Sequence, residues 1–382
     1  MKKICFITTS RADFGMVNII LDKKKKYKKK IKIFLIVSGN HNDKFFGKSI
    51  NEIKVKKNVK KLTVFLNQRN INSCSVAISL SYFMKKYSLI FKKLKPSIFV
   101  AFGDRYEMLA ATLSAFIQKI PIAHIAGGEK TSGSLDDNFR HSITKFSNLH
   151  FPTSKIYKKR IVQLGENPNT VFNYGSLNRQ KIASTKFTSR KVLEKKYKLI
   201  FFKRNILMTL HPENVGTKIN IKNLKIVLNS LNNQKDTGII ITSPNADAEG
   251  DKMIEIIEKF VKNKKKFKFI KSLGTVDYLS ILKQIDGVIG NSSSGISEVP
   301  LFSINTINLG DRQIGREAPS TVINCKINKK EISRNLKKLK RKKNLIKINN
   351  KDKFVAKKIL NKIINFNFKR YNNKFYDIKF NI

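Results

Sequence analysis

Four carboxylates gather in one stretch of the chain, at Asp104, Glu129, Asp136 and Asp137. The chain holds 26 acidic residues against 78 basic ones, so a cluster of acids is informative. Glycines stand next to the first two, and glycine lets a ligand approach the backbone closely. We therefore interpret this cluster as a general acid/base site. The alternative is that these acids are helix caps or ion-pair partners of Arg105, Arg140 and Lys145.

A second chemical signature is the glycine- and serine-rich turn from Gly290 to Glu298, between a predicted strand and a predicted helix. Such a turn gathers N–H and hydroxyl donors for a diphosphate, and Glu298 can accept hydrogen bonds from ribose hydroxyls. The turn lacks the Gly-Lys-Ser/Thr ending of a Walker motif. The alternative is a flexible linker. The predicted ligand-binding residues here are Ser292, Ser293, Gly295 and Glu298.

Further polar side chains follow predicted strands, where loops of a parallel sheet meet ligands. His211 comes after an apolar run that Pro212 ends, so its imidazole is available to a phosphate. Two of the candidates have ordinary alternatives: Arg11 in a surface ion pair, and His41 as a loop histidine. The predicted binding residues in such loops are Arg11, His41, Arg105, Asn245 and Arg312, and His211 is added to the catalytic group.

Alternating strands and helices have to position these residues. Apolar runs at Ser97–Phe102 and Ile120–Ile125 predict buried parallel strands, with Glu107–Gln118 as the helix between them. The same reading predicts further strands at Ile4–Thr8, Ile31–Val37, Asn148–Phe151, Val171–Tyr174, Ile206–Leu210, Gly238–Thr242, Lys268–Lys271, Gly287–Ile289 and Ile304–Leu309, a first helix at Met16–Lys23, and a polar connection at Asn178–Tyr197.

Length and composition bound the class of protein. At 382 residues, 41% of them apolar, the chain suits two α/β domains rather than one core. The net charge of +52 is scattered over many predicted helices and loops, so we expect a solvated surface and no nucleic-acid partner. No run approaches the roughly 18 apolar residues of a membrane span, so we expect no membrane association. The three cysteines are far apart and lack metal-ligand spacing, so we expect no metal site and a reducing, cytoplasmic location.

Several blocks, taken in order, resemble one family. They are SRADFG, GDRYEMLA, HIAGGEKTSG, LDDNFRHSITK, TLHPEN, SPNADAEG, GNSSSGISEVP and INLGDRQIGRE. Together they are similar to the hydrolysing UDP-N-acetylglucosamine 2-epimerases of the bacterial sialic acid type. The resemblance covers roughly residues 1 to 325.

The resemblance implies a GT-B fold, with two facing Rossmann-like domains and the active site in the cleft between them. It implies sugar chemistry on residues 1–178, nucleotide binding on residues 179–355, and a helical tail at 356–382 that packs back on the first domain. The reaction it implies eliminates UDP and then adds water to the resulting glycal, with no cofactor and with a homodimer as the assembly. Asp104, Glu129 and Asp136 would be the acid/base residues.

One departure and two alternatives remain open. Several members of this family carry an acid where this chain has Ala126, so that task falls to Glu129 or to water. The substrate is either UDP-N-acetylglucosamine or a UDP- or GDP-linked diacetamido-trideoxy sugar of legionaminic acid synthesis. The second alternative is a GT-B glycosyltransferase, which would need an acceptor.

Overall fold

The computed structural model describes residues 1–23, 27, 29–42, 49–55, 59–66, 73–131, 135–213, 217–244, 250–340, 350–368 and 374–378. The chain forms two compact units. Unit 1 comprises Met1–Lys130, Leu135–Ala183 and Asn349–Ile382, and unit 2 comprises Thr131–Ser134 and Ser184–Ile348. Each unit contains one six-stranded sheet, and all the strand pairs are parallel.

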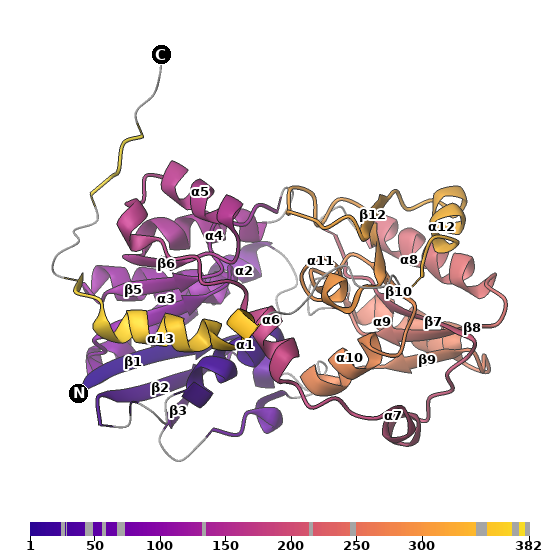
Figure 1. Ribbon diagram of the computed structural model, residues 1–382, viewed down its shortest axis with the longest axis horizontal. Helices are drawn as coiled ribbons and strands as arrows, with labels where there is room; N and C mark the ends of the chain where they lie inside the picture. The colour runs from indigo at the N-terminus through magenta and orange to yellow at the C-terminus, as the bar shows by residue number, and fades with distance from the viewer. Residues whose placement is uncertain are drawn as a thin grey trace. The chain divides into compact units, whose positions relative to one another are not determined.

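The sheet of unit 1 has the strand order β3-β2-β1-β4-β5-β6, so the chain reverses its direction of growth beside β1 (Figure 1). Such a reversal opens a crevice at the carboxyl ends of the strands. The strands are β1 (Lys2–Thr8), β2 (Ile31–Val37), β3 (Val59–Thr63), β4 (Ile98–Phe102), β5 (Ile122–Ile125) and β6 (Leu149–Phe151). The helices are α1 (Arg11–Asp22), α2 (Ser73–Leu94), α3 (Tyr106–Ile117), α4 (Leu135–Phe146), α5 (Lys155–Gln163), α6 (Leu177–Ser184) and α13 (Val355–Asn365).

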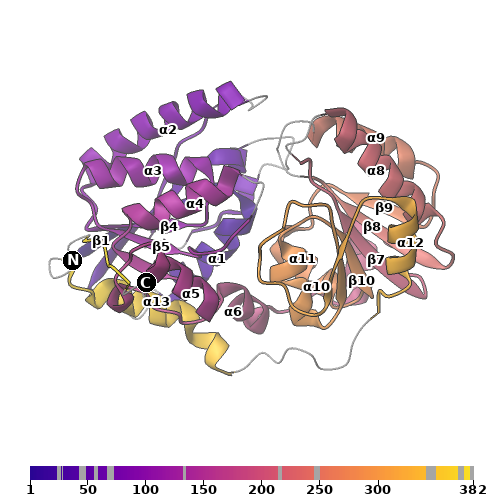
Figure 2. The ribbon, with the colours of Figure 1, turned by 90° about the horizontal axis from the view of Figure 1, so that it is seen from above.

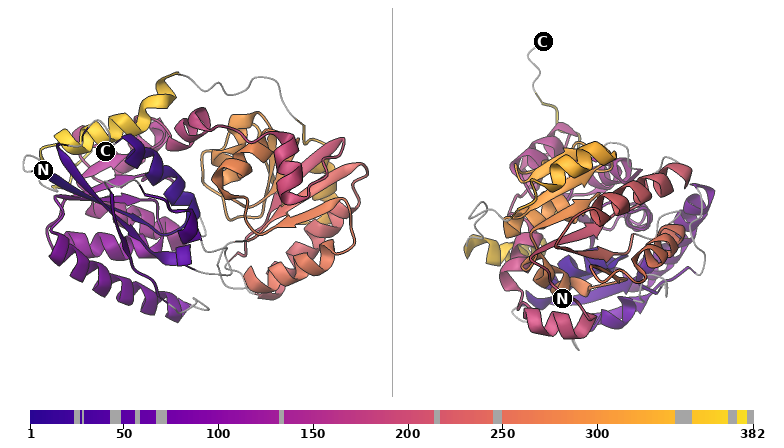
Figure 3. Two further views of the ribbon diagram at one scale, coloured as in Figure 1. Left: turned by 90° about the horizontal axis from the view of Figure 1, so that it is seen from below. Right: turned by 90° about the vertical axis from the view of Figure 1, so that its right-hand side faces the viewer.

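Helices cover both faces of this sheet, because its strands are apolar on both sides. In β1, Ile4 and Phe6 face the cluster formed with α1 and α13, whereas Cys5 and Ile7 face the cluster formed with α2 and α3. Figures 2 and 3 show α2, α3 and α4 on one side of the strands and α13 on the other. The two cores of unit 1 therefore follow from the two-residue alternation of side chains along β1.

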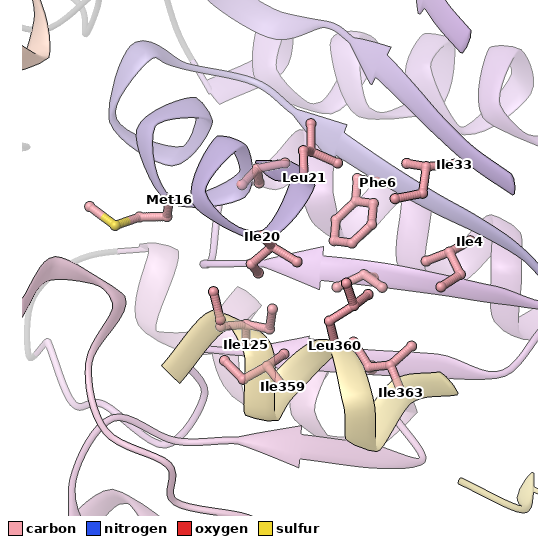
Figure 4. Packing of buried hydrophobic residues seen from close by; sticks show 14 of the residues in the cluster. Ile4, Phe6, Met16, Ile20, Leu21, Ile33, Ile125, Ile359, Leu360 and Ile363 are labelled. Carbon is pink, nitrogen blue, oxygen red and sulfur yellow. The ribbon is translucent and has the colours of Figure 1, made fainter. Parts of the chain in front are cut away.

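The last helix belongs to the core of unit 1. Ile359, Leu360 and Ile363 of α13 are at most 1% exposed and pack against Ile20 of α1 and against Phe6 of the sheet (Figure 4). They recur with the spacing of one helix face. Helix α13, near the end of the sequence, thus completes the hydrophobic core on one face of β1, at the start of the sequence.

Unit 2 repeats the architecture, with the strand order β12-β11-β10-β7-β8-β9. Buried residues of α8, α9 and α12 fill the core on one face of its sheet. The strands are β7 (Arg204–Thr209), β8 (Thr237–Thr242), β9 (Phe267–Ile270), β10 (Gly287–Gly290), β11 (Asn305–Leu309) and β12 (Val322–Cys325). The helices are α7 (Arg190–Tyr197), α8 (Thr217–Asn232), α9 (Gly250–Val261), α10 (Gly274–Leu282), α11 (Ser294–Ser297) and α12 (Lys329–Leu336).

Three local predictions were wrong. The first helix begins at Arg11 rather than Met16, because Ser10 and Asp13 form a capping box. The predicted strand Val171–Tyr174 is reduced to one bridge between Val171 and His150. The predicted connection Asn178–Tyr197 contains α6 and α7, whose buried Leu177, Ile182 and Leu193 stand among many lysines. Strands β3 and β12 were not predicted.

Candidate active site

In unit 1 a buried arginine joins three of the predicted acidic positions. Arg140 of α4 is 1% exposed, and its Nη1 donates to Asp137 Oδ1 at 2.8 Å and to the Glu129 carbonyl oxygen at 3.1 Å. Its Nη2 donates to the carboxylate of Asp104. These partners come from the loop after β4, the loop after β5 and the first turn of α4. The arginine therefore fixes the acidic cluster from behind.

Arg140 remains a cation in this position. Burial alone would lower its pKa, but the nearby carboxylates of Asp104 and Glu129 outweigh burial, and the pKa lies above its ordinary value. From the sequence, Arg140 was expected only as a possible ion-pair partner of the acids. The structure shows that the ion pair exists, and that it holds Asp104 in a partly exposed position, with 24% of its side chain accessible.

Two of the other acids differ in their placement from the prediction, whereas Glu129 follows its strand as expected. Asp136 and Asp137 lie in the first turn of α4 and not at a strand end. Glu129 is half-buried and follows β5, and its backbone carbonyl accepts a hydrogen bond from Arg140. Acidic side chains in a first turn are favoured by the helix dipole, which offers positive partial charge there. Asp136 also lies near a cation: the pKa of Arg105 is well above its ordinary value mainly through the charge of Glu107, and the charge of Asp136 adds to the effect.

The residue before the two glycines of this loop is conformationally unusual. Ala126, at the end of β5, has φ 67°, a left-handed backbone that residues with a Cβ adopt infrequently. Its N–H donates to Phe151 O at 3.1 Å, which ties the turn to β6. Observed strain of this kind clusters at functional sites. Ala126 thus adopts a left-handed turn directly before Gly127, Gly128 and Glu129, at the position where an acidic residue was expected from the family resemblance.

His41 is buried and hydrogen-bonded. It lies in the short helix η2 (Gly39–Asn42), is 0% exposed, and places Nδ1 2.8 Å from Ser49 Oγ and Nε2 2.9 Å from Thr8 Oγ1. The Thr8 hydroxyl donates to Asp13, so its lone pair accepts from His41 Nε2–H. Each ring nitrogen of His41 thus already faces a hydroxyl of the protein.

Asp13, which was not among the predicted site residues, organises the turn after β1. Its carboxylate accepts from Thr9 N at 2.9 Å, from Thr9 Oγ1 at 2.8 Å and from Ser10 N at 3.1 Å. Burial raises the pKa of Asp13, against the effect of these donors. The capping box was the signal that could have identified it. Arg11 is the first residue of α1, and its side chain lies outside the described part of the structure.

A second buried histidine connects the acidic cluster to the sheet. His124 of β5 donates from Nε2 to Gly103 O at 2.9 Å, and its Nδ1 lies 3.1 Å from Thr144 Oγ1. Burial lowers its pKa to about 3, so the ring is neutral at physiological pH. It links the residue next to Asp104 with the helix that carries Arg140. Its position inside an apolar strand gave no functional signal in the sequence.

In unit 2, Asn291 holds His211 through its backbone. Asn291 Oδ1 accepts from His211 N at 2.7 Å, and Asn291 Nδ2 donates to His211 O at 2.9 Å. The two residues follow β7 and β10, which are neighbours in the sheet. Burial, with the charge of Arg312 in addition, places the pKa of His211 well below its ordinary value. The imidazole is therefore a neutral hydrogen-bonding group.

The serine turn follows β10 closely. Gly290 has φ 146°, and a Cβ there would stand 1.8 Å from Thr209 O, so only glycine allows this approach. Ser292 and Ser293 precede α11, while Gly295 lies in it against Thr306, whose Oγ1 donates to Gly295 O at 2.7 Å. Glu298 ends this one-turn helix instead of standing one turn inside it, and its side chain is buried.

The remaining predicted residues of unit 2 are only partly defined. Arg312 is half-buried, and its Nη1 lies 3.4 Å from Asn291 O. Asn245 lies outside the described residues. Within the described ranges, no three His, Cys, Asp or Glu side chains converge as metal ligands would. In the same ranges, no helix has both the length and the apolar character needed to cross a membrane.

Comparisons with known proteins agree on one family. Residues 23–366 match the model of a family described as UDP-N-acetylglucosamine 2-epimerase. The GDP/UDP-N,N'-diacetylbacillosamine 2-epimerase (hydrolyzing) of Campylobacter jejuni is 38% identical over 329 residues, covering 86% of this chain and 85% of the relative. The polysialic acid biosynthesis protein P7 of Escherichia coli is 36% identical over 338 residues, covering 88% and 85%.

A solved structure shows the same fold. The UDP-GlcNAc 2-epimerase from Neisseria meningitidis, bound to UDP-GlcNAc, matches with a TM-score of 0.76 and 17% identity, over 95% of this chain and 99% of that one. At this identity the likeness concerns the fold alone. The expected two-domain α/β architecture of GT-B type is confirmed.

Neutral His124 makes stability depend on pH. A folded-state pKa near 3 against an ordinary 6.5 means that the unfolded chain takes up the proton first, so stability is complete above pH 6.5 and is lost as the pH falls. Between pH 6 and 4, we expect the free energy of unfolding of His124→Gln to fall less steeply than that of the wild type, by about 1.4 kcal/mol per pH unit. Urea titrations at several pH values measure this. Parallel pH profiles would contradict it.

Proposed function

Because this chain belongs to the UDP-N-acetylglucosamine 2-epimerase family, we propose that it is a hydrolysing 2-epimerase that converts UDP-N-acetylglucosamine and water to N-acetylmannosamine and UDP. Unit 1 carries the sugar chemistry in this proposal, and unit 2 binds the nucleotide. The observation that supports it most is the cluster of Asp104, Asp137 and the Glu129 loop around buried Arg140. Such a cluster supplies carboxylates in fixed positions for moving a proton at carbon.

The first step is an elimination. The C1–O bond breaks, its electron pair leaves with the diphosphate oxygen, and the C2 proton passes to a carboxylate as the C1–C2 double bond forms. The C2 proton is weakly acidic, so C–O cleavage runs ahead and gives C1 oxocarbenium character, which the acidic cluster stabilises. Asp104, Glu129 and Asp136 are the acid/base candidates.

The second step hydrates the glycal. Water adds its oxygen to C1 and gives one proton to a carboxylate, while a carboxylic acid gives a proton to C2 from the face opposite to the one that lost it. A pair of groups on different elements suits this exchange of faces. Asp104 follows β4 and Asp136 belongs to α4, so two such elements contribute acids to this part of unit 1.

The diphosphate is assigned to polar groups of unit 2 and to Arg11. Neutral His211 would donate a hydrogen bond to a phosphate oxygen instead of pairing as a cation, in keeping with its lowered pKa. Ser292 and Ser293 add hydroxyl and N–H donors, Glu298 accepts from the ribose, and Arg312 neutralises the leaving group. Gly295 permits close approach, and Asn245 is retained as a contact to the nucleotide.

A second candidate substrate follows from the comparisons. The Campylobacter jejuni relative, at 38% identity, is named for GDP/UDP-N,N'-diacetylbacillosamine. The same elimination and hydration would apply to that diacetamido sugar, since the reacting atoms are C1 and C2. Incubation with UDP-N-acetylglucosamine and with UDP- and GDP-linked diacetamido-trideoxyglucose, each alone, decides the substrate by the sugar that is released. A glycosyltransferase would release none without an acceptor.

Loss of an acid should affect turnover far more than binding. We expect Asp104→Asn and Glu129→Gln each to lower kcat by about a hundredfold, the scale of a lost general acid or base. Affinity for UDP, measured by calorimetry, should stay within about threefold, because neither side chain is assigned to the nucleotide. Glu258→Gln, at an exposed ion pair with Lys271 in unit 2, is the matched control. Near-normal kcat in either variant would remove that residue from the acid/base assignment.

Isotopic labels test the reaction itself. In heavy-oxygen water the C1 oxygen of the released sugar should carry the label and UDP should not, because water adds to the glycal and C1–O bond cleavage releases UDP. In deuterated water the product should gain one deuterium at C2. Mass spectrometry and NMR read both. Label on UDP would indicate attack at phosphorus, and a product of gluco configuration without C2 deuterium would indicate simple glycoside hydrolysis.

A further inference from the structure

A fully buried glutamate stands behind the predicted binding residue Arg105. Glu107, in the first turn of α3, has a side chain that is 0% exposed, whereas 27% of the Arg105 side chain is accessible. Arg105 Nε donates to Glu107 Oε2 at 3.1 Å, and Arg105 Nη2 lies 3.4 Å from Glu107 Oε1. The ion pair thus connects the protein interior to its surface at the end of β4.

The surroundings of Glu107 close it off from solvent. Gly39 has φ 58°, and a Cβ there would lie 2.9 Å from Glu107 Oε1 and 2.5 Å from Thr9 O. Gly39, which follows β2, therefore packs closely against the Glu107 carboxylate because it has no side chain. Tyr87 is buried near Glu107: its pKa is well above the ordinary value through burial, with the charge of Glu107 adding to it. Within the described ranges, Arg105 is the cation that pairs with this carboxylate.

This pairing orients the guanidinium. A guanidinium has five N–H donors in a rigid plane, and Glu107 engages the edge formed by Nε and Nη2. Nη1 makes no hydrogen bond with any residue that the structure describes, and 27% of the side chain is accessible, so the edge formed by Nη1 and Nη2 is the one left for a ligand. The Tyr106 ring, with its centroid 5.8 Å from Arg105 Cζ, limits the movement of the plane. A fixed outer edge with two parallel N–H groups matches two oxygens of a phosphate.

We propose that Glu107 is a positioning residue, which holds Arg105 so that its outer edge receives the diphosphate of the nucleotide sugar. This rests on the proposed function. In such a substrate the diphosphate is the anionic group, and an arginine already fixed in one rotamer loses little conformational entropy when it binds. This role accounts for the position of Glu107. A carboxylate that only stabilised the first turn of α3 could do so from the surface, without pairing with Arg105.

Charge removal without change of size tests the proposal. In Glu107→Gln, we expect the dissociation constant for UDP and the KM for the nucleotide sugar each to rise about tenfold, with kcat within threefold of the wild type. Arg105→Lys keeps the cation but loses the two-donor edge, so it should weaken UDP binding to a similar extent. Glu194→Gln, which breaks the exposed ion pair of Glu194 with Arg190 on α7, should leave both constants unchanged.

A second pair of variants separates positioning from folding. Arg105→Ala leaves a buried carboxylate without its cation and should lower Tm markedly. Combined with Glu107→Gln, the same change should recover most of that Tm while UDP affinity stays low. Wild-type UDP affinity and KM in Glu107→Gln, or recovery of UDP affinity in the double variant, would overturn the role of Glu107. A wild-type protein that neither binds UDP nor turns over any nucleotide sugar would overturn the proposed function instead.

Discussion

The guanidinium of Arg140 has to be matched by negative charge, because an unpaired ion in a protein interior costs several kcal/mol. With its side chain 1% exposed, it is matched by Asp104 and Asp137 and by the Glu129 carbonyl. These partners come from three successive segments, the loop after β4, the loop after β5 and the first turn of α4. The requirement to neutralise one buried cation therefore fixes the positions of Asp104 and Asp137, and it leaves the Asp104 side chain partly accessible.

Neutral histidines and glycines complete the arrangement by fixing backbone positions. His124 connects Gly103 to Thr144 and so keeps the loop of Asp104 and helix α4 together. In unit 2, the Asn291 side chain fixes the backbone of His211 through hydrogen bonds to its N–H and its carbonyl oxygen. Groups held in this way lose little freedom when a substrate binds, and this preorganisation is the main electrostatic source of catalysis. The parallel sheets supply the frame, since their strands end at one edge.

Most strands of both sheets could be predicted, because buried parallel strands are short, apolar and bounded by glycine or charge. The edge strands β3 and β12 were missed because their sequences, VKKLT and VINC, are partly polar and lack this apolar pattern. The acids Asp104 and Glu129 were proposed as site residues from glycine neighbours and from the scarcity of acids. No such role was predicted for Arg140, His124 and Glu107, because a buried polar residue is identified by its burial and its partners, and the sequence shows neither. Lysines among the apolar positions likewise concealed α6 and α7.

The central interaction can be measured by a double-mutant cycle on the free energy of unfolding, with Arg140→Met, Asp104→Asn and the double variant. If Arg140 and Asp104 depend on each other, each single change removes one ionic partner of the other group, and the double variant is less destabilised than the sum. We expect a coupling of more than about 1 kcal/mol. Additive effects, within about 0.5 kcal/mol, would show that Asp104 stands in its place without Arg140 and would contradict this account.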